Sequence, residues 1–281
     1  MSSKTIKLSS TQPMAEIQAK RTEPVYKQKL YKLLTGLALP VTLIIVWQIL
    51  GDHDYISTLL FPTPTTILDS LITLYQSGEL MDNLKVSLVR ILSGFALGAG
   101  LGFVIGMAVG LIRYVEKTLD PTIQMIRMVP HLALTTLFVL WFGIGETAKV
   151  LLIAKGAFFP LYINTYLGIR GVDNKYFEVA KVLGFSRFKQ IIRLIIPASL
   201  PNVFLGIRLS VAVSWLGLVV AEIMGSTSGI GYLMMDARAM SMTSTVFVGI
   251  LLFAILGKIS DIIVVSLEKH WLRWRDSFQG L

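Results

Sequence analysis

The chain has 281 residues, of which 54% are hydrophobic and 15% are charged, and its formal net charge is +9. A soluble domain usually has about a quarter of its residues charged. The apolar residues fall instead into blocks of about 20, enough to cross a bilayer core of about 30 Å as a helix. The blocks lack the two-residue alternation of barrel strands, so the sequence predicts an all-α membrane protein. The absence of cysteine excludes disulfides and Cys-ligated metal sites.

The first 33 residues are hydrophilic and carry seven Lys and Arg, which predicts a tail outside the membrane. A short surface helix is expected within it, around Pro24–Lys32. The first apolar run, Leu34–Leu50, is followed by "GDHDY" rather than by a small-residue cleavage site. This run therefore predicts a membrane span and not a signal peptide.

Six helices are predicted to span the membrane, forming a domain over residues 34–266 that is followed by a tail at 267–281. The spans are expected at 34–50, 88–112, 123–144, 147–169, 202–224 and 244–266. Pro130 is expected to interrupt the third span and Pro160 the fourth, with neighbouring helices satisfying the freed backbone groups. A short helix on the outer face is predicted within 51–87. The glycine-broken segment 225–243 is predicted to fold back into the outer mouth of a pathway.

The charge distribution predicts the orientation of these spans. With six spans, both termini lie on one side, whose segments hold 18 Lys and Arg, against two in the segments on the other side. Lys and Arg collect in cytoplasmic loops, so both termini are predicted to be cytoplasmic. This bias accounts for the positive net charge, so the charge does not indicate nucleic-acid binding. The cytoplasmic segments are 1–33, 113–122, 170–201 and 267–281.

The cytoplasmic segment 170–201 contains all but the last residue of "EVAKVLGFSRFKQIIRLIIPASLPN" (178–202). This stretch predicts a pair of short helices. The first helix, at 175–183, is expected to end in a left-handed turn at Gly184. Ser186 is a predicted N-cap for the second helix, and Pro197 is predicted to stop it. So short a pair cannot be stable through its own core, so it requires the membrane surface or a partner protein. The apolar face of the second helix comprises Phe188, Ile191, Ile192 and Ile195.

This stretch resembles the "EAA" loop of ABC importer permeases. Glu178 and Ala180 match the family pattern, Gly184 follows the Glu by six residues and Pro197 follows the Gly by thirteen, whereas Val179 replaces an Ala. In the family, the loop forms coupling helices that dock into a groove on a cytoplasmic ATPase subunit. The positions that the resemblance implies for this coupling are Glu178, Val179, Ala180, Leu183, Gly184, Phe185 and Pro197.

The resemblance covers most of the chain beyond its first 30 or so residues. Segments 119–150, 159–170, 213–238 and 267–274 are similar to permeases for nitrate, taurine and alkanesulfonates. Within that group, "RMVPHLAL", "LWFGIGE" and "LYINT" are most similar to the aliphatic sulfonate branch. The resemblance implies a type I ABC importer permease (MetI-like) fold in the bacterial inner membrane. It also implies transport of a small anion by alternating access, with aliphatic sulfonates expected first and taurine, nitrate or bicarbonate as alternatives.

The implied partners are a second copy of the chain, two cytoplasmic ATPase subunits that carry ATP and Mg, and an external substrate-binding protein. The chain itself shows no nucleotide site: "GKIS" (257–260) lacks a phosphate loop's first glycine, which is replaced by Leu252. No hydrolytic or metal-ligating constellation is found, so we expect no enzyme activity, cofactor or metal on this chain. A stand-alone secondary transporter is the alternative from another class.

Glycines recur every fourth residue in the second predicted span. This spacing makes a smooth helix face that another backbone can approach closely. Whether that face meets the same chain or a second copy is not decided by the pattern. The residues are Gly94, Gly98, Gly102, Gly106 and Gly110.

Polar residues within the spans are candidates for a substrate pathway, because charged groups at membrane depth should face protein or water. For each, a hydrogen bond between helices is the competing interpretation. Lys258 and Asp261, three residues apart, are predicted to pair, and Lys149 is predicted to extend toward the membrane surface. The pathway candidates are His131, Lys155, Asn164, Arg208, Ser210, Ser214 and Glu222.

Overall fold

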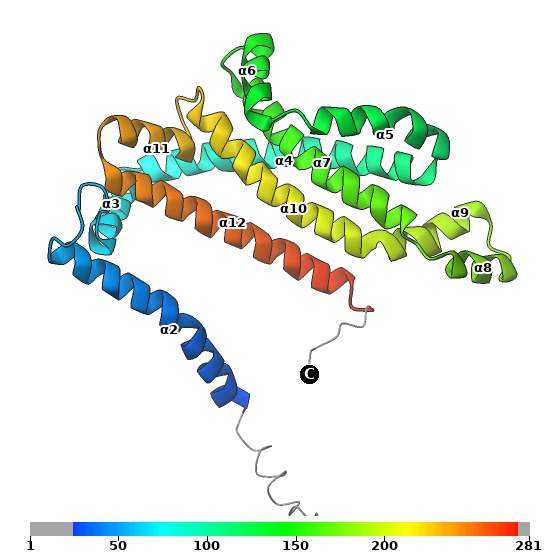
Figure 1. Cartoon of the computed structure of the whole chain (residues 1–281), viewed down its shortest axis with the longest axis horizontal. Coiled ribbons are helices and arrows are strands. Elements are labelled where there is room, and N and C mark those ends of the chain that lie inside the picture. The colour runs from blue at the N-terminus through cyan, green and yellow to red at the C-terminus, as the bar shows by residue number, and fades with distance from the viewer. Residues whose placement is uncertain (1–24, 275–281) are drawn as a thin grey trace, which may run out of the picture. The chain divides into compact units, whose positions relative to one another are not determined.

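The computed structural model describes residues 25–274, with side chains from residue 36 onward, and every regular element in this part of the chain is a helix (Figure 1). The chain divides into two compact units that meet between Thr65 and Thr66, and each is considered separately. Residues 1–24, most of the predicted N-terminal tail, lie outside the described residues, as do residues 275–281 of the C-terminal tail.

The first unit contains helix α2 (Val25–Asp52), which continues through Pro40. The surface helix predicted near Pro24–Lys32 and the span predicted at 34–50 are therefore parts of one helix. Its apolar section is Gly36–Asp52. Large apolar side chains such as Leu39 and Leu43 are exposed along this section, as on a helix whose surroundings are lipid.

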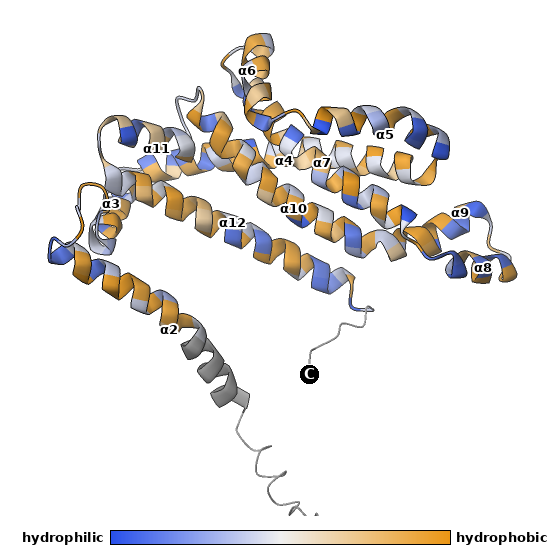
Figure 2. Ribbon diagram, in the orientation of Figure 1, coloured by the Kyte–Doolittle hydropathy of each residue, from blue (hydrophilic) through white to orange (hydrophobic). Residues whose placement is uncertain are grey.

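Four long helices form the centre of the second unit: α4 (Glu79–Leu111), α7 (Glu146–Arg170), α10 (Ile196–Ile223) and α12 (Thr243–Trp271). Each is long and apolar enough to cross a membrane, and Figure 2 shows that hydrophobic residues predominate along them. Helix α7 packs between α4 and α10, and α12 packs on α10. We call the end where α7 begins and α10 ends the arginine end, after Arg90, and the opposite end the loop end.

The glycine row of α4 faces α7 of the same chain. A methyl group added at Gly98 would lie 1.9 Å from the carbonyl oxygen of Ala154, and one added at Gly102 would lie 2.5 Å from that of Phe158. Gly94, Gly106 and Gly110 meet α7 in the same manner. The two helices therefore run in parallel with their backbones in direct contact, an approach that a Cβ atom would prevent.

Two apolar clusters fill the space among these helices. One lies toward the arginine end and joins α4, α7 and α10 through Ile91, Ile153, Trp215 and Leu218. The other lies nearer the loop end and joins the same helices through Ala99, Ala157, Leu161 and Val203.

The third predicted span, 123–144, is not one helix. Helix α5 (Arg113–Arg127) and helix α6 (His131–Phe142) meet at a bend of 97°. Pro130 supplies no backbone N–H and disfavours a helical conformation at the residue before it, so the helix ends there. Residues 113–122, predicted to be a connecting segment, form the first part of α5 instead.

Polar side chains hold α5 against the last turns of α7. Tyr162 donates to the Asp120 carboxylate at 2.6 Å, and Tyr166 donates to Glu116 at 2.8 Å. Arg170 forms an ion pair with Glu116. The position of α5 therefore depends on directional bonds, and none of its own residues is buried.

The prediction that Pro160 interrupts the fourth span was wrong, because α7 is continuous from Glu146 to Arg170. Pro160 has no backbone N–H, so it cannot donate a hydrogen bond to the carbonyl of Gly156, four residues earlier. Gly156 itself packs closely on α10, where an added Cβ would lie 3.1 Å from the Val213 carbonyl oxygen. Contacts with neighbouring helices on two sides keep this helix intact despite the proline.

Two short helices lie in the connections at the arginine end. Segment 51–87 contains the predicted short helix, α3 (Pro64–Gln76), and also the first turns of α4. Segment 225–243 contains α11 (Ile230–Ala239), which packs against both α10 and α12.

By length and composition, four helices of the described residues qualify as spans, and α5 with α6 makes a fifth if the bent pair counts as one. With α2, whose apolar section is shorter, six is the number that the sequence predicts; that count stays a prediction. Only 17% of the most apolar stretch of α12 is buried against the chain, so its hydrophobic surface faces outward. This is the arrangement that lipid requires.

We predict that Gly98→Ala lowers the free energy of unfolding by about 1–3 kcal/mol, the range for overpacking a tight contact. The added methyl group cannot fit without moving α4 away from Ala154. Gly100→Ala is the matched control, because nothing lies within 4 Å of its added Cβ. The melting temperatures of the two purified variants in detergent measure the difference, and equal values would contradict the close approach.

Candidate functional site

The predicted helix pair is present at the loop end. Helix α8 (Asn174–Val182) begins at Asp173, whose side chain accepts a hydrogen bond from Lys175 N at 3.0 Å. It ends at Gly184, which has φ +66°. There Phe185 N donates to Ala180 O at 2.9 Å and Gly184 N donates to Lys181 O at 3.0 Å. These two bonds form a Schellman motif, which favours a glycine at the left-handed position.

The second helix of the pair begins as predicted but does not stop at Pro197. Ser186 caps α9 (Arg187–Gln190) by accepting from Lys189 N at 3.4 Å. A π-helical turn, Ile191–Ile195, then joins α9 directly to α10. The prediction of a proline stop was therefore wrong. Ile196 N donates to Ile191 O, five residues back, so the wider turn carries the chain past the proline without a break.

The helix pair exposes apolar side chains near its turn, among the mixed hydrophobic and hydrophilic residues of α8 and α9 in Figure 2. Val182 is 88% exposed, and Val179, Leu183 and Phe188 are also exposed, whereas the small Ala180 is buried. Glu178 lies exposed beside them. Apolar residues grouped on an exposed surface indicate an interaction site.

A cleft of about 750 Å³ lies beside this pair, between α8, the first turns of α10 and the end of α12. Pro197 and Arg193 line it from the continuous helix, Asp173 and Tyr176 from the α8 region, and Glu268 from α12. Pro197 therefore lies at the wall of this cleft, apart from the exposed apolar residues of α8.

A buried cluster of charged side chains joins the helices at the arginine end. The guanidinium of Arg90 is 3% exposed and donates to both carboxylate oxygens of Glu146, at 2.7 and 2.6 Å. It also donates to Glu222 at 2.9 Å and to the backbone carbonyl of Ser228 at 2.6 Å. One cation thus connects α4, α7, α10 and the segment before α11. Bidentate pairing of this kind fixes geometry as well as supplying energy.

Glu222, a predicted pathway residue, is enclosed in this cluster. Its carboxylate accepts from Ser87 Oγ at 2.7 Å and from Gly231 N at 2.8 Å, and the residue is 1% exposed. A Cβ at Gly229, which has φ +109°, would lie 2.2 Å from the carboxylate. The sequence "SGIG" therefore allows the backbone to close over the buried Glu222 carboxylate, which is bonded to three partners within the chain.

Sequence reasoning missed Arg90 and Glu146. Both residues were visible: Arg90 falls near the start of the predicted span 88–112, and Glu146 lies in the two-residue connection before the fourth span. The usable signal was an arginine in an apolar run, which requires a carboxylate partner at the same depth.

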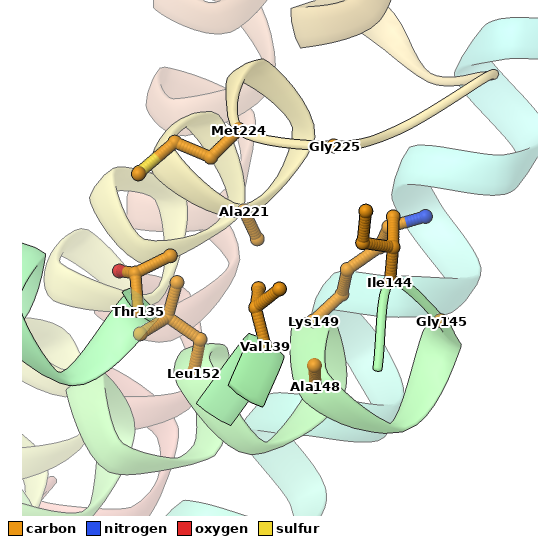
Figure 3. Close-up of a pocket in the computed structure, with 10 residues that line it drawn as sticks. All are labelled: Thr135, Val139, Ile144, Gly145, Ala148, Lys149, Leu152, Ala221, Met224 and Gly225. Atoms are coloured by element: carbon orange, nitrogen blue, oxygen red, sulfur yellow. The ribbon is translucent and has the colours of Figure 1, made fainter. Parts of the chain in front are cut away.

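Lys149 also belongs to this cluster. Its ammonium contacts the carboxylate of Glu146, at the start of α7, at 3.0 Å, and the residue is 8% exposed. Lys149 lines a small cavity of about 20 Å³ with residues of α6, α7 and the end of α10, including Thr135, Ala221 and Met224 (Figure 3). This volume is close to that of one water probe, so the cavity is too small to pass a solute.

A second charged group joins α10 and α12. Arg208 contacts the Asp261 carboxylate with two nitrogens, at 2.5 and 3.2 Å. Lys258 contacts the same carboxylate at 3.5 Å, which confirms the predicted Lys258–Asp261 pair. Arg208 therefore makes the interhelical contact that the sequence left open as an alternative to a pathway role.

Three further pathway candidates are bonded to backbone carbonyls. Ser210 donates to Ala157 O on α7 at 2.7 Å, whereas Ser214 donates to Ser210 O within its own helix, also at 2.7 Å. Asn164 donates to Pro160 O at 2.8 Å. The Ser210 bond links two helices, and the other two are internal to one helix.

The last two candidates, His131 and Lys155, meet at the break between α5 and α6. The Lys155 ammonium donates to Val129 O, just before the break, at 3.2 Å and lies 5.7 Å from the centre of the Phe159 ring. His131, the first residue of α6, has a buried Nε2 atom with no hydrogen-bond partner among the described residues. Both residues lie at this break, where His131 also packs against Gly156 of α7 and Gly217 of α10.

Long apolar helices, buried ion pairs between them and an exposed helical loop at one end define a multi-pass helical membrane protein. The chain belongs to the family of inner membrane components of binding-protein-dependent transport systems, whose profile matches residues 98–273. It is thus a multi-pass membrane protein of the ABC permease class, whose members are non-catalytic subunits.

The similar curated proteins include two putative aliphatic sulfonates transport permeases. The Bacillus subtilis protein is 52% identical over 268 residues, covering 95% of this chain and 96% of its own length. The Escherichia coli protein is 44% identical over 240 residues, covering 85% and 91%. A taurine transport permease of Escherichia coli is 33% identical, covering 84% and 88%.

We predict that Arg90→Gln lowers the free energy of unfolding by about 3–5 kcal/mol, because Glu222 remains buried without its cation. Lys85→Gln is the control on the same helix: Lys85 and its partner Asp82 are 73% and 80% exposed, and such pairs contribute about 0–1 kcal/mol. Thermal unfolding of both variants in detergent tests this. A stable Arg90→Gln variant would show that the cluster is not needed for the fold.

Proposed function

We propose that the chain is the permease subunit of an ATP-driven importer that passes aliphatic sulfonates across the cytoplasmic membrane by alternating access. The choice of substrate is supported by the 52% identity, over nearly the full length of both chains, to a protein named for aliphatic sulfonate transport. The 44% identical relative carries the same name.

The proposed complex contains two copies of this chain, two ATPase subunits with ATP and Mg, and an external binding protein that delivers the solute. Both termini and the coupling loop at 170–201 lie in the cytoplasm, and the spans occupy 34–266. The distribution of Lys and Arg supports this orientation. In it, the loop end is cytoplasmic and the arginine end faces outward.

The coupling loop docks on the ATPase through the turn between α8 and α9. Val179, Leu183 and the adjoining Glu178 are exposed there, and the Schellman motif fixes their direction. Ala180 allows the pair to pack closely, and Gly184 and Phe185 form the turn. Pro197 lies in the first turn of α10, apart from this docking surface. ATP can drive the permease between states only if nucleotide-bound ATPase favours one of them, and this contact transmits that preference.

The first test reconstitutes the permease with its ATPase in liposomes. We predict that binding protein loaded with an alkanesulfonate stimulates ATP hydrolysis and solute uptake by about tenfold or more over unloaded protein. Loading in turn with taurine and with bicarbonate tests the other solutes named for relatives that are 33% and 31% identical. Stimulation by taurine or bicarbonate, and not by an unsubstituted alkanesulfonate, would reassign the substrate.

A second test addresses the coupling loop. We predict that Leu183→Asp abolishes recovery of the ATPase with the purified permease, because it places a charge on the exposed apolar surface. The membrane content of the variant should be unchanged, since Leu183 is 62% exposed. Asn174→Asp adds the same charge to the first turn of α8 and should preserve the complex. Normal ATPase recovery with Leu183→Asp would remove this surface from the interface.

A further inference from the structure

Lys155 differs from the other cations of the four long helices. Outside the last turn of α12, every other Lys and Arg of these helices lies within 4.0 Å of a carboxylate of the described chain. The paired residues are Lys85, Arg90, Lys149, Arg170, Arg208 and Lys258. Lys155 contacts a carbonyl oxygen and an aromatic ring, neither of which neutralises a full charge.

The depth of Lys155 makes this difference significant. It lies nine residues into α7, about 14 Å from the start of the helix at a rise of 1.5 Å per residue. A lysine at such a depth in a bilayer requires a counter-charge or a polar pathway. It cannot extend to the nearer surface, because its ammonium is directed to Val129 O at the α5–α6 break.

A second copy of the chain offers no free carboxylate at this depth among the described residues of the four long helices. Glu146 lies at the start of α7, Glu222 at the end of α10 and Asp261 inside α12, and each already forms an ion pair. The remaining carboxylates of these helices, Glu79, Asp82 and Glu268, lie in or next to end turns. Helix α6 contains no acidic residue, and the acids of α5 bond to α7. The counter-charge for Lys155 is therefore expected from outside the chain.

His131 supplies a second polar group at the same break. Its ring packs between the two central helices: Cε1 lies 3.6 Å from a Cβ built on Gly156 of α7, and Nε2 lies 3.3 Å from one built on Gly217 of α10. The two glycines leave room for an imidazole in an otherwise apolar contact. A buried polar nitrogen without a partner is costly, so an occupant that accepts a hydrogen bond would stabilise it.

We propose that the Lys155 ammonium and the His131 imidazole bind the anionic head group of the solute at the break between α5 and α6. The inference rests on the proposed function, since it identifies the site within the pathway. A sulfonate suits it because its oxygens accept hydrogen bonds from both groups and its charge is permanent. Arg208 and Glu222, engaged with their own partners, are not part of this site.

The natural chain has no cysteine, so a single thiol can be introduced without background labelling. We expect Lys155→Cys to reduce ATP-driven ethanesulfonate uptake in proteoliposomes about tenfold, the equivalent of one lost charged contact. Treatment with aminoethyl methanethiosulfonate attaches a primary ammonium and should restore uptake. Methyl methanethiosulfonate attaches a neutral group and should not. Ethanesulfonate should also slow the labelling.

Lys258→Cys is the matched control, because Lys258 is also within a long helix but pairs with Asp261; its uptake should be insensitive to either reagent. His131→Phe preserves ring packing and is expected to reduce uptake without loss of ATPase assembly. If Lys155→Cys fails to assemble, His131→Phe and Lys155→Arg replace it in the test, and Lys155→Arg should retain uptake.

Three outcomes would overturn the inference: normal uptake by Lys155→Cys, equal rescue by the neutral reagent, or normal uptake by His131→Phe. Each presupposes that the unaltered permease imports ethanesulfonate, in which case the proposed function stands and only this site fails. Absence of uptake by the unaltered complex would instead reject the sulfonate assignment. The measurements therefore separate the two proposals.

Discussion

The arrangement of the central helices depends on one buried guanidinium. Arg90 of α4 contacts Glu146 at the start of α7 and Glu222 at the end of α10, and it also binds the backbone that leads into α11. The side chains of Arg90 and Glu222 are buried and cannot be solvated, so each must remain with the other, whereas Glu146 binds Arg90 from the exposed start of α7. The apolar clusters and the α4–α7 contact supply area, but apolar surfaces alone do not distinguish one rotation of a helix from another. The charged cluster does, because its bonds are directional.

The requirement that a polar group inside the membrane has a bonding partner also explains the positions of other polar side chains. Ser210, Arg208 and the tyrosines of α7 each form bonds to a neighbouring helix, and their roles are structural in the described chain. Lys155 and His131, at the α5–α6 break, are different. The Lys155 ammonium contacts only a backbone carbonyl and an aromatic ring. A permease must keep its fold fixed and still present polar groups to a solute. In the proposed site the two demands are met by different residues.

The sequence was sufficient for the helical class, the positions of the long apolar helices and the turn at Gly184, because hydropathy and glycine conformation are local properties. It also predicted a close-packed glycine face, but its partner could not be identified, since the spacing describes one helix only. The effects of prolines were judged poorly. Pro160 and Pro197 lie within continuous helices because packing on neighbours and a π-helical turn compensate for them. Arg90 was overlooked because its partners are 56 and 132 residues away along the chain.

The π-helical turn keeps Arg187 to Ile223 in one helix of 37 residues, with no break at Pro197. A turn of this kind bends a helix, and in Figure 1 α9 turns away from the line of α10. One extremity lies beside the exposed turn of α8 and α9, and the other carries Glu222, adjacent to the last residue. Because hydrogen-bonded helix continues past Pro197, α9 and Glu222 belong to one continuous element. A displacement of α9 therefore meets no proline break before the helix that contributes Glu222 to its ion pair with Arg90.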